Sequence, residues 1–238
     1  MHEIIRILLR EIKAVDTPAN RTDYQRFFKE KLEHPIGLKT PVLRKVSNSV
    51  FKTVARRGKH EILTICDEML AGRRRYMRFV AFEWAGKLEK SYEKKDFARF
   101  ERWLEEYVDG WGSCDHLCGV LGKIIAEFPD LSRRRSKWSR SKNMWLRRAS
   151  AVALIEPVRR GLLLEDVFET AIALLKDEED LVQKGYGWML KVTGDYFFED
   201  ARRFVMRHKD EMPRTALRYA IEKWPPARRK EAMARSRP

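Results

Sequence analysis

Trp111 and Asp115 are the two residues whose types and spacing best suit a chemical role. They stand four apart, so on a helix that begins near Trp111 an aromatic ring and a carboxylate share one face at its N-terminal end. A carboxylate on a basic surface can oppose positive charge that develops on a bound substrate. The alternative is a capping carboxylate and a core tryptophan. Similar segments around Trp145 and Trp188, at repeat spacing, favour the chemical reading.

Cys114, His116 and Cys118 raise the question of a zinc site. On a helix Cys114 and Cys118 share a face while His116 points away, and no second cysteine or histidine pair supplies further ligands. We therefore expect no metal and interpret the cysteines as small buried hydrophobic residues. Three irregularly spaced cysteines do not make a disulfide framework, which predicts a reducing, cytosolic compartment. The sequence lacks a Walker A loop and a glycine-rich dinucleotide fingerprint, so we expect no cofactor.

The chain is strongly basic, with 50 Lys and Arg against 35 Asp and Glu in 238 residues and a net charge of +15. The segment Ser132–Arg148 holds eight basic residues, no acidic one, and two tryptophans, Trp138 and Trp145. A cation run without acidic partners predicts phosphate binding, and we expect nucleic acid as the partner. A charge-rich solvated surface, such as a thermophile carries, is the alternative. Because no helix-turn-helix or zinc-finger motif is present, backbone and shape readout are favoured over base reading.

Apolar residues recur at helical spacing along nearly the whole chain, as in Ile5, Leu8 and Ile12. Thr40 and Pro41 predict a helix N-cap followed by proline at the first helical position. Prolines divide the chain into about a dozen helices of roughly 10 to 16 residues. We find no convincing alternating strand, no signal peptide, and no run near the ~20 apolar residues of a membrane span. These patterns predict an all-α protein.

Charged residues recur at a nearly fixed spacing, since Arg78, Asp115, Arg148 and Lys184 are 37, 33 and 36 residues apart. A period of roughly 35 to 40 residues holding two helices is typical of HEAT-type solenoids. We predict a right-handed α-solenoid of HEAT-like helix pairs, one domain over residues 1–238 with about six pairs. Asp115, Arg148 and Lys184 should then face one basic concave groove. Chance register in a chain that is 36% charged is the alternative.

Four motifs stand in order along the chain: Ile36–Arg44, Trp111 with Asp115, Trp145–Ala149, and Gly187–Lys191. Their order and spacing resemble the AlkD-type DNA alkylation repair proteins, which are HEAT-like-repeat DNA glycosylases. The resemblance runs from about Arg21 to about Lys223. Gly112 departs from the family pattern, which commonly has Asp directly after the tryptophan.

The resemblance implies a role for several of these residues. Trp111, Trp188 and Asp115 would surround the nucleotide that bears the lesion, and Arg148 would hold a backbone phosphate. Three further residues match positions that contact phosphates in the family, namely Thr40, Arg44 and Lys191.

The function that the resemblance implies is hydrolysis of the N-glycosidic bond of N3- or N7-alkylated purines in double-stranded DNA, without flipping the base into a pocket. Alkylation there makes the base cationic and a good leaving group, so no general acid is needed. Asp115 would stabilise oxocarbenium character at the sugar, and Trp111 and Trp188 would pack against it. We expect a monomer. Two alternatives stay open: a non-catalytic module that binds DNA structure, which Gly112 keeps possible, and a HEAT scaffold for an acidic protein.

Overall fold

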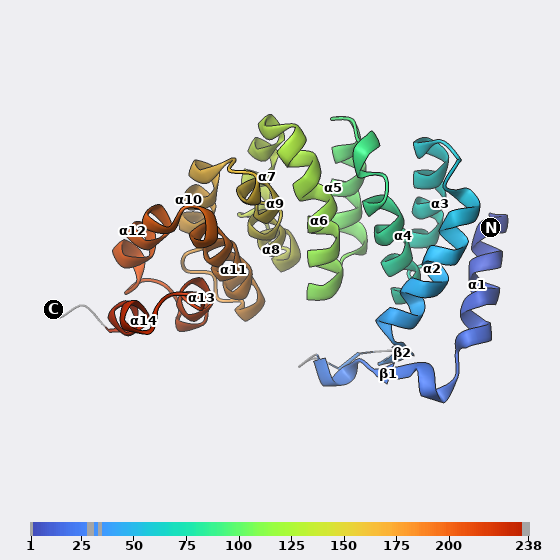
Figure 1. Ribbon diagram of the computed structural model, residues 1–238, viewed down its shortest axis with the longest axis horizontal. Coiled ribbons are helices and arrows are strands. Elements are labelled where there is room, and N and C mark those ends of the chain that lie inside the picture. Colours follow the sequence, from blue (N-terminus) through green and yellow to red (C-terminus); the bar gives the residue numbers. More distant parts are fainter. Residues whose placement is uncertain (1, 28–30, 33–34, 235–238) are drawn as a thin grey trace. The chain divides into compact units, whose positions relative to one another are not determined.

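The computed structural model describes residues 2–27, 31–32 and 35–234. Its contacts divide the chain into two compact units, an N-terminal unit, Met1–Ser91, and a C-terminal unit, Tyr92–Pro238. Helices dominate both units, which confirms the predicted all-α class (Figure 1). The single domain over residues 1–238 stays a prediction.

The N-terminal unit packs its helices around an apolar core that includes Leu8, Val54, Ile62 and Trp84. Trp84 donates its indole N–H to the buried Ser47 hydroxyl at 3.1 Å, so the polar edge of the ring has a partner. The elements in chain order are α1 (Glu3–Val15), η1 (Pro18–Asn20), β1 (Arg21–Asp23), η2 (Gln25–Phe27), β2 (Ile36–Leu38), α2 (Thr40–Val54), α3 (Lys59–Ala71), α4 (Arg75–Gly86) and η3 (Glu89–Ser91).

A small antiparallel sheet joins α1 to α2, in a stretch where the sequence shows no convincing alternating strand. Strands β1 and β2 pair with Thr22 opposite Gly37. Each strand has three residues, which is too short for an alternating pattern to stand out. The Tyr24 hydroxyl donates to the Leu38 carbonyl at 2.6 Å, and a Cβ on Gly37 would lie 3.0 Å from the Tyr24 ring. Glycine therefore lets the tyrosine close over the sheet.

Helix α2 begins one residue earlier than predicted. Its first residue is Thr40 and its N-cap is Lys39, with no side-chain capping bond, whereas the sequence predicted Thr40 as the cap. Pro41 lies in the first turn as expected, because a proline there loses no helical hydrogen bond. The difference of one residue leaves Thr40 and Pro41 in the same turn.

The C-terminal unit is a run of helices in chain order, from green to red in Figure 1. Their lengths range from 5 to 17 residues, so the predicted range of 10 to 16 is too narrow. The elements are α5 (Asp96–Tyr107), α6 (Trp111–Glu127), η4 (Pro129–Leu131), α7 (Ser132–Trp138), α8 (Met144–Val152), α9 (Ile155–Arg159), α10 (Leu164–Ala173), α11 (Asp180–Tyr196), α12 (Phe198–His208), α13 (Arg214–Ala220) and α14 (Pro226–Met233). In the described part of the chain, no helix has both the length and the apolarity to cross a membrane.

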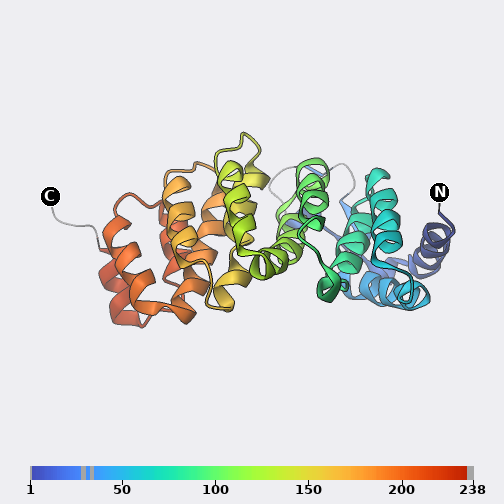
Figure 2. The same ribbon diagram turned by 90° about the horizontal axis from the view of Figure 1, so that it is seen from above.

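The helices of this unit form two layers, and neighbours along the chain pack as pairs across them (Figure 2). One layer contains α6, α8, α11 and α13, with α8 packed against α6 and α11, and α11 against α13. The other contains α5, α7, α10 and α12, which meet through side chains such as the stacked Phe168 and Phe204, 4.9 Å between ring centroids. Helix pairs that bury their faces against neighbouring pairs are the expected packing of a helical repeat.

Two glycines let helices in this unit approach closely. A Cβ on Gly122 of α6 would lie 2.7 Å from the Ala153 carbonyl oxygen, and a Cβ on Gly187 of α11 would lie 2.7 Å from that of Ala216. Real Cβ atoms do not come this near to backbone oxygens. Any larger residue would therefore push the helices apart.

Trp138, one of the two tryptophans in the basic segment, belongs to the core. Its ring stacks on Phe97 of α5 with 5.8 Å between centroids, and its indole N–H donates to Glu101 at 2.9 Å. The ring is 3% exposed, so it packs α7 against α5 and is not available for stacking on a ligand.

Candidate active site

Trp111 is the first residue of α6, directly after the extended Gly110, which confirms the predicted start of this helix. Trp111 is 39% exposed, which excludes a core role for it. Asp115 lies one turn further along α6, past the capping position held by Gly110. The structural alternative of a capping carboxylate and a core tryptophan is therefore wrong for both residues.

Asp115 is held by Arg148 of α8 through two parallel hydrogen bonds. The Arg148 Nε donates to Asp115 Oδ1 at 2.8 Å, and its Nη2 donates to Oδ2 at 2.8 Å. The Arg148 side chain is 6% exposed and that of Asp115 is 20% exposed. A bidentate arginine fixes both the position and the plane of a carboxylate. Asp115 therefore presents one defined edge to solvent.

Arg148 is anchored a third time, because its Nη1 donates to the carbonyl oxygen of Leu181 in the first turn of α11. Burial alone would lower the pKa of Arg148, but the hydrogen bonds and charge of Asp115 outweigh it, and the pKa is raised above its usual value. Three of the five guanidinium N–H groups thus have partners inside the protein. Two are left for another acceptor.

Lys184, Trp188 and Lys191 follow one face of α11 at spacings of four and three. Trp188 is half-buried. Lys184 pairs with Asp180 at 2.7 Å, and Lys191 pairs with Glu222 at 2.8 Å. Surface ion pairs of this kind contribute little to stability, so either lysine can exchange its carboxylate for another anion at small cost.

Gly185, which lies between Lys184 and Trp188 along α11, gives room for Arg148. A Cβ there would lie 3.2 Å from Arg148 Cγ and 3.3 Å from Nη1. The Arg148 side chain therefore packs directly against α11 at Gly185, where a larger residue would leave it no room. In this way α6, α8 and α11 together build the carboxylate site.

Thr40 and Arg44 belong to the N-terminal unit, in the first turns of α2. The Arg44 guanidinium pairs with Glu83 of α4 through Nη2 at 3.1 Å and lies 5.4 Å from the Phe79 ring centroid. Half of the Arg44 side chain is exposed. The roles of these two residues as phosphate contacts stay predictions.

The basic segment Ser132–Arg148 does have acidic partners, so the inference that it lacks them is wrong. The carboxylates come from other helices or, for Asp177, from the turn before α11, 30 to 33 residues away in the sequence, so the segment itself does not reveal them. The pairs are Arg134 with Glu101, Arg135 with Asp166, Arg147 with Asp177, and Arg148 with Asp115.

The other four cations of this segment are exposed, and no carboxylate in the described part of the chain pairs with them. They are Arg133 and Lys137 on α7, and Arg140 and Lys142 in the turn before α8. Four of the eight cations of this segment are thus held in ion pairs within the protein, and the other four are exposed to solvent.

Cys114 and Cys118 are buried on the inner side of α6, with 4.0 Å between their sulfur atoms. Burial raises the pKa of the Cys118 thiol well above its usual value, so the thiol stays neutral and packs as a small apolar group. Among the residues that the structure describes, no group of three or more His, Cys, Asp or Glu side chains could hold a metal ion.

Sequence reasoning missed Gly185 and the carbonyl of Leu181 as parts of this site. A carbonyl oxygen carries no sequence signal. Gly185 did have one, because two glycines two residues apart inside a helix, Gly185 and Gly187, mark places where other groups approach closely.

Stacked helix pairs with a fixed carboxylate one helical turn from an exposed tryptophan are the architecture of a helical-repeat protein with a polar site on its surface. The sequence profile of the DNA alkylation repair enzymes matches residues 8–224, so the chain belongs to that family. Family membership supports a role in DNA alkylation repair.

A solved structure described as a predicted DNA alkylation repair enzyme from Enterococcus faecalis has the same fold. It superimposes with a TM-score of 0.69 at 17% identity, over 80% of this chain and 88% of that chain. No curated protein matches the sequence.

Proposed function

We propose that this protein is a DNA glycosylase that hydrolyses the N-glycosidic bond of cationic N3- or N7-alkylated purines in duplex DNA. The observation that carries the proposal is the Asp115 carboxylate, fixed by two hydrogen bonds from the buried Arg148, one helical turn from the exposed Trp111. Family membership supplies the substrate class of alkylated DNA.

The proposed reaction breaks the bond between C1′ of the deoxyribose and the purine nitrogen. The base departs with the bonding electron pair, and because it was cationic it leaves as a neutral purine. Water adds its oxygen to C1′ and releases a proton. Since the leaving group needs no protonation, one of the two carboxylates usual in glycoside hydrolysis is unnecessary.

Asp115 has two tasks in this scheme. Its negative charge opposes the positive charge that develops on the sugar, and a free lone pair orients the attacking water. An ionised carboxylate has about four acceptor sites, and Arg148 takes two of them. The others remain for water and sugar, and the orientation that Arg148 imposes is in place before substrate binds.

The proposed phosphate contacts lie around this centre and on α2. Lys184 and Lys191 flank Trp188 along α11, and Arg148 has two N–H groups left for a phosphate while it keeps Asp115. The electron-rich faces of Trp111 and Trp188 would favour the cationic sugar by about 0.5 to 2 kcal/mol each. Thr40 and Arg44 complete the proposed set.

The proposed reaction needs no pocket for an extruded base. A hollow of about 850 Å³ lies between α10 and α12 and is lined by none of the proposed site residues. Enzymes that flip a base enclose it in a snug pocket. Catalysis at the sugar alone fits a carboxylate on an open helix face.

The test is release of modified bases from methylated duplex DNA by the purified protein. We expect free 7-methylguanine and 3-methyladenine at a rate above the spontaneous loss. Release at the spontaneous rate, by protein that binds the duplex, would refute the glycosylase.

A second candidate is a protein that binds DNA structure without cutting the glycosidic bond. Arg148 engages both oxygens of Asp115, and Gly112 has no side chain to add to this turn, as a Cβ there would meet no atom within 4 Å. Binding without base release in the same experiment would support this candidate.

A further inference from the structure

Arg147, the neighbour of Arg148, makes a second set of contacts, to the turn before α11. Its Nε donates to Asp177 Oδ2 at 2.6 Å, and its Nη2 lies 3.4 Å from Asp177 Oδ1. Its Nη1 donates to the carbonyl oxygens of Ser141 and Lys142, each at 3.0 Å. One guanidinium therefore ties the turn before α8 to the turn before α11.

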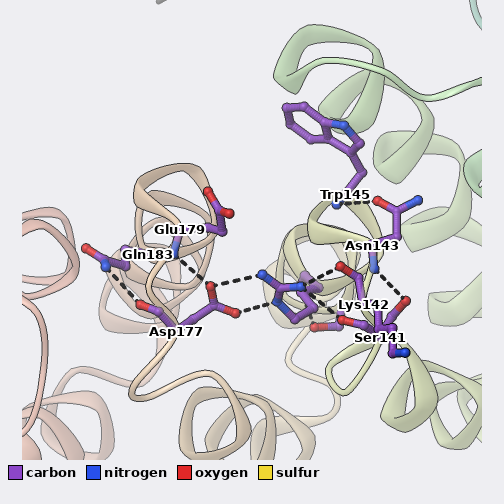
Figure 3. A network of polar contacts seen from close by, with 9 residues as sticks. Ser141, Lys142, Asn143, Trp145, Asp177, Glu179 and Gln183 are labelled. Carbon is purple, nitrogen blue, oxygen red and sulfur yellow. Dashed lines mark hydrogen bonds and ion pairs between the residues drawn. The ribbon is translucent and has the colours of Figure 1, made fainter. Parts of the chain in front are cut away.

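Asp177 in turn fixes the chain that enters α11. Its Oδ1 accepts the backbone N–H of Glu179, the N-cap of α11, at 3.0 Å. Its carbonyl oxygen accepts the amide N–H of Gln183 at 2.8 Å (Figure 3). The Asp177 side chain is only 7% exposed, so water cannot replace Arg147 freely.

The two adjacent arginines thus hold two neighbouring points of the chain where it enters α11. Arg147 binds Asp177 before α11 begins, and Arg148 binds the Leu181 carbonyl inside the first turn. If that turn moved, Arg148 would lose an acceptor that keeps its guanidinium in the plane of Asp115. The Asp115 carboxylate would then rotate together with the Arg148 guanidinium.

We propose that Arg147 and Asp177 are positioning residues for the Asp115 carboxylate, acting through the first turn of α11 and Arg148. This inference rests on the proposed glycosylase function for its effect on rate. Its structural part, the orientation of Arg148, does not depend on that function.

Asp177→Asn is the sharpest variant. The asparagine Oδ1 can still accept from Glu179 and the backbone still accepts from Gln183, while the charge that holds Arg147 is removed. We expect the single-turnover release of 7-methylguanine to fall roughly 10- to 100-fold, as small misplacements of a catalytic group do, with unchanged affinity for undamaged duplex. Nitrogen-15 NMR should show faster exchange of the Arg148 Nε proton, which Asp115 protects in the wild type.

Glu101→Gln is the matched control. Glu101 also pairs with an arginine on another helix of this unit, Arg134, and a glutamine there can still accept from Trp138. This pair lies between α5 and α7 and does not contact α11. We expect wild-type rate and wild-type exchange at Arg148.

Asp177→Asn with wild-type rate and wild-type exchange, or an equal loss in Glu101→Gln, would overturn the inference. If Asp177→Asn does not fold, Arg147→Lys replaces it, because lysine keeps the charge but cannot bind Asp177 and two carbonyls together. If the wild type releases no base, the proposed function fails, and the exchange of the Arg148 Nε proton alone decides the inference.

Discussion

Asp115 combines two properties that a surface carboxylate rarely has together, a fixed orientation and an open edge. Arg148 gives the orientation through two bonds of 2.8 Å. The remaining exposure of Asp115, 20% of its side chain, leaves room for a sugar or a water. A charge that is already oriented need not reorganise when positive charge develops nearby, which is why such groups stabilise transition states well.

Asp115→Asn should keep DNA binding but slow release of 7-methylguanine by roughly 10- to 1,000-fold, the range for loss of one preorganised electrostatic contact. Asparagine preserves size and one acceptor for Arg148 while deleting the charge. Affinity need not fall, since a negative charge near phosphates is removed. Release rates and affinities are measured below the melting temperature of the variant, and equal release by variant and wild type would remove Asp115 from the mechanism.

Arg148→Ala should weaken binding to damaged and undamaged duplexes alike, because a phosphate contact reads no base. The slope of log affinity against log salt should fall by about one. Loss of the partner of a buried pair should also lower the free energy of unfolding by about 3 kcal/mol. Salt titrations and thermal melts measure both effects. An unchanged slope with the loss of stability would mean that Arg148 acts only through Asp115.

At the scale of helices, glycines set how closely the layers of the C-terminal unit can pack. Gly187 of α11 faces the Ala216 carbonyl of α13, where a Cβ would come within 2.7 Å. Gly119 on the outer side of α6 faces open space. The same residue type thus serves packing at one position and only weakens the helix at the other.

Gly187→Ala should lower the free energy of unfolding by about 1–3 kcal/mol through overpacking. Gly119→Ala should raise it by about 0.5–1 kcal/mol, because alanine favours the helix and meets no neighbour. Denaturant unfolding of the two variants beside the wild type measures both changes. Two changes of the same sign would contradict the packing described for these helices.

Much of the local organisation was predictable, and the limits have physical causes. The pairing of Trp111 and Asp115 on one helix face assumed a helix that begins near Trp111, and α6 does begin there. The three-residue strands left no periodic pattern. The carboxylate partner of Arg134 lies on another helix and that of Arg147 in the turn before α11, so the basic segment looked unpaired in the sequence. The contact of Asp115 with Arg148 needed the packing of α6 on α8, although their separation of 33 residues had placed them in equivalent repeat positions.

The same period organises the ion pairs of the C-terminal unit as a whole. Pairs between neighbouring repeats join residues 28 to 36 apart, as in Glu127 with Arg160 and Lys191 with Glu222. Each pair links a helix to a helix, a helix end or a turn of a neighbouring repeat. Ion pairs between repeats therefore neutralise many of the charges of this unit. The positive charge that can attract a polyanion comes from the cations that are exposed or weakly paired.

DNA binding should therefore depend on which cations are removed, even at equal net charge. Lys184→Gln with Lys191→Gln removes two charges beside Trp188, and Arg133→Gln with Lys137→Gln removes two from α7, in the other layer. Both double variants have the same net charge, so long-range attraction is matched. The α11 variant should reduce the salt slope by about 1.8, the value for two phosphate contacts, and the α7 variant should leave it unchanged. Fluorescence anisotropy of a labelled duplex across a salt series measures the slopes. Equal slopes for the two variants would mean that phosphates are not held locally along α11, and a larger loss for the α7 variant would move the DNA to the layer of α5, α7, α10 and α12.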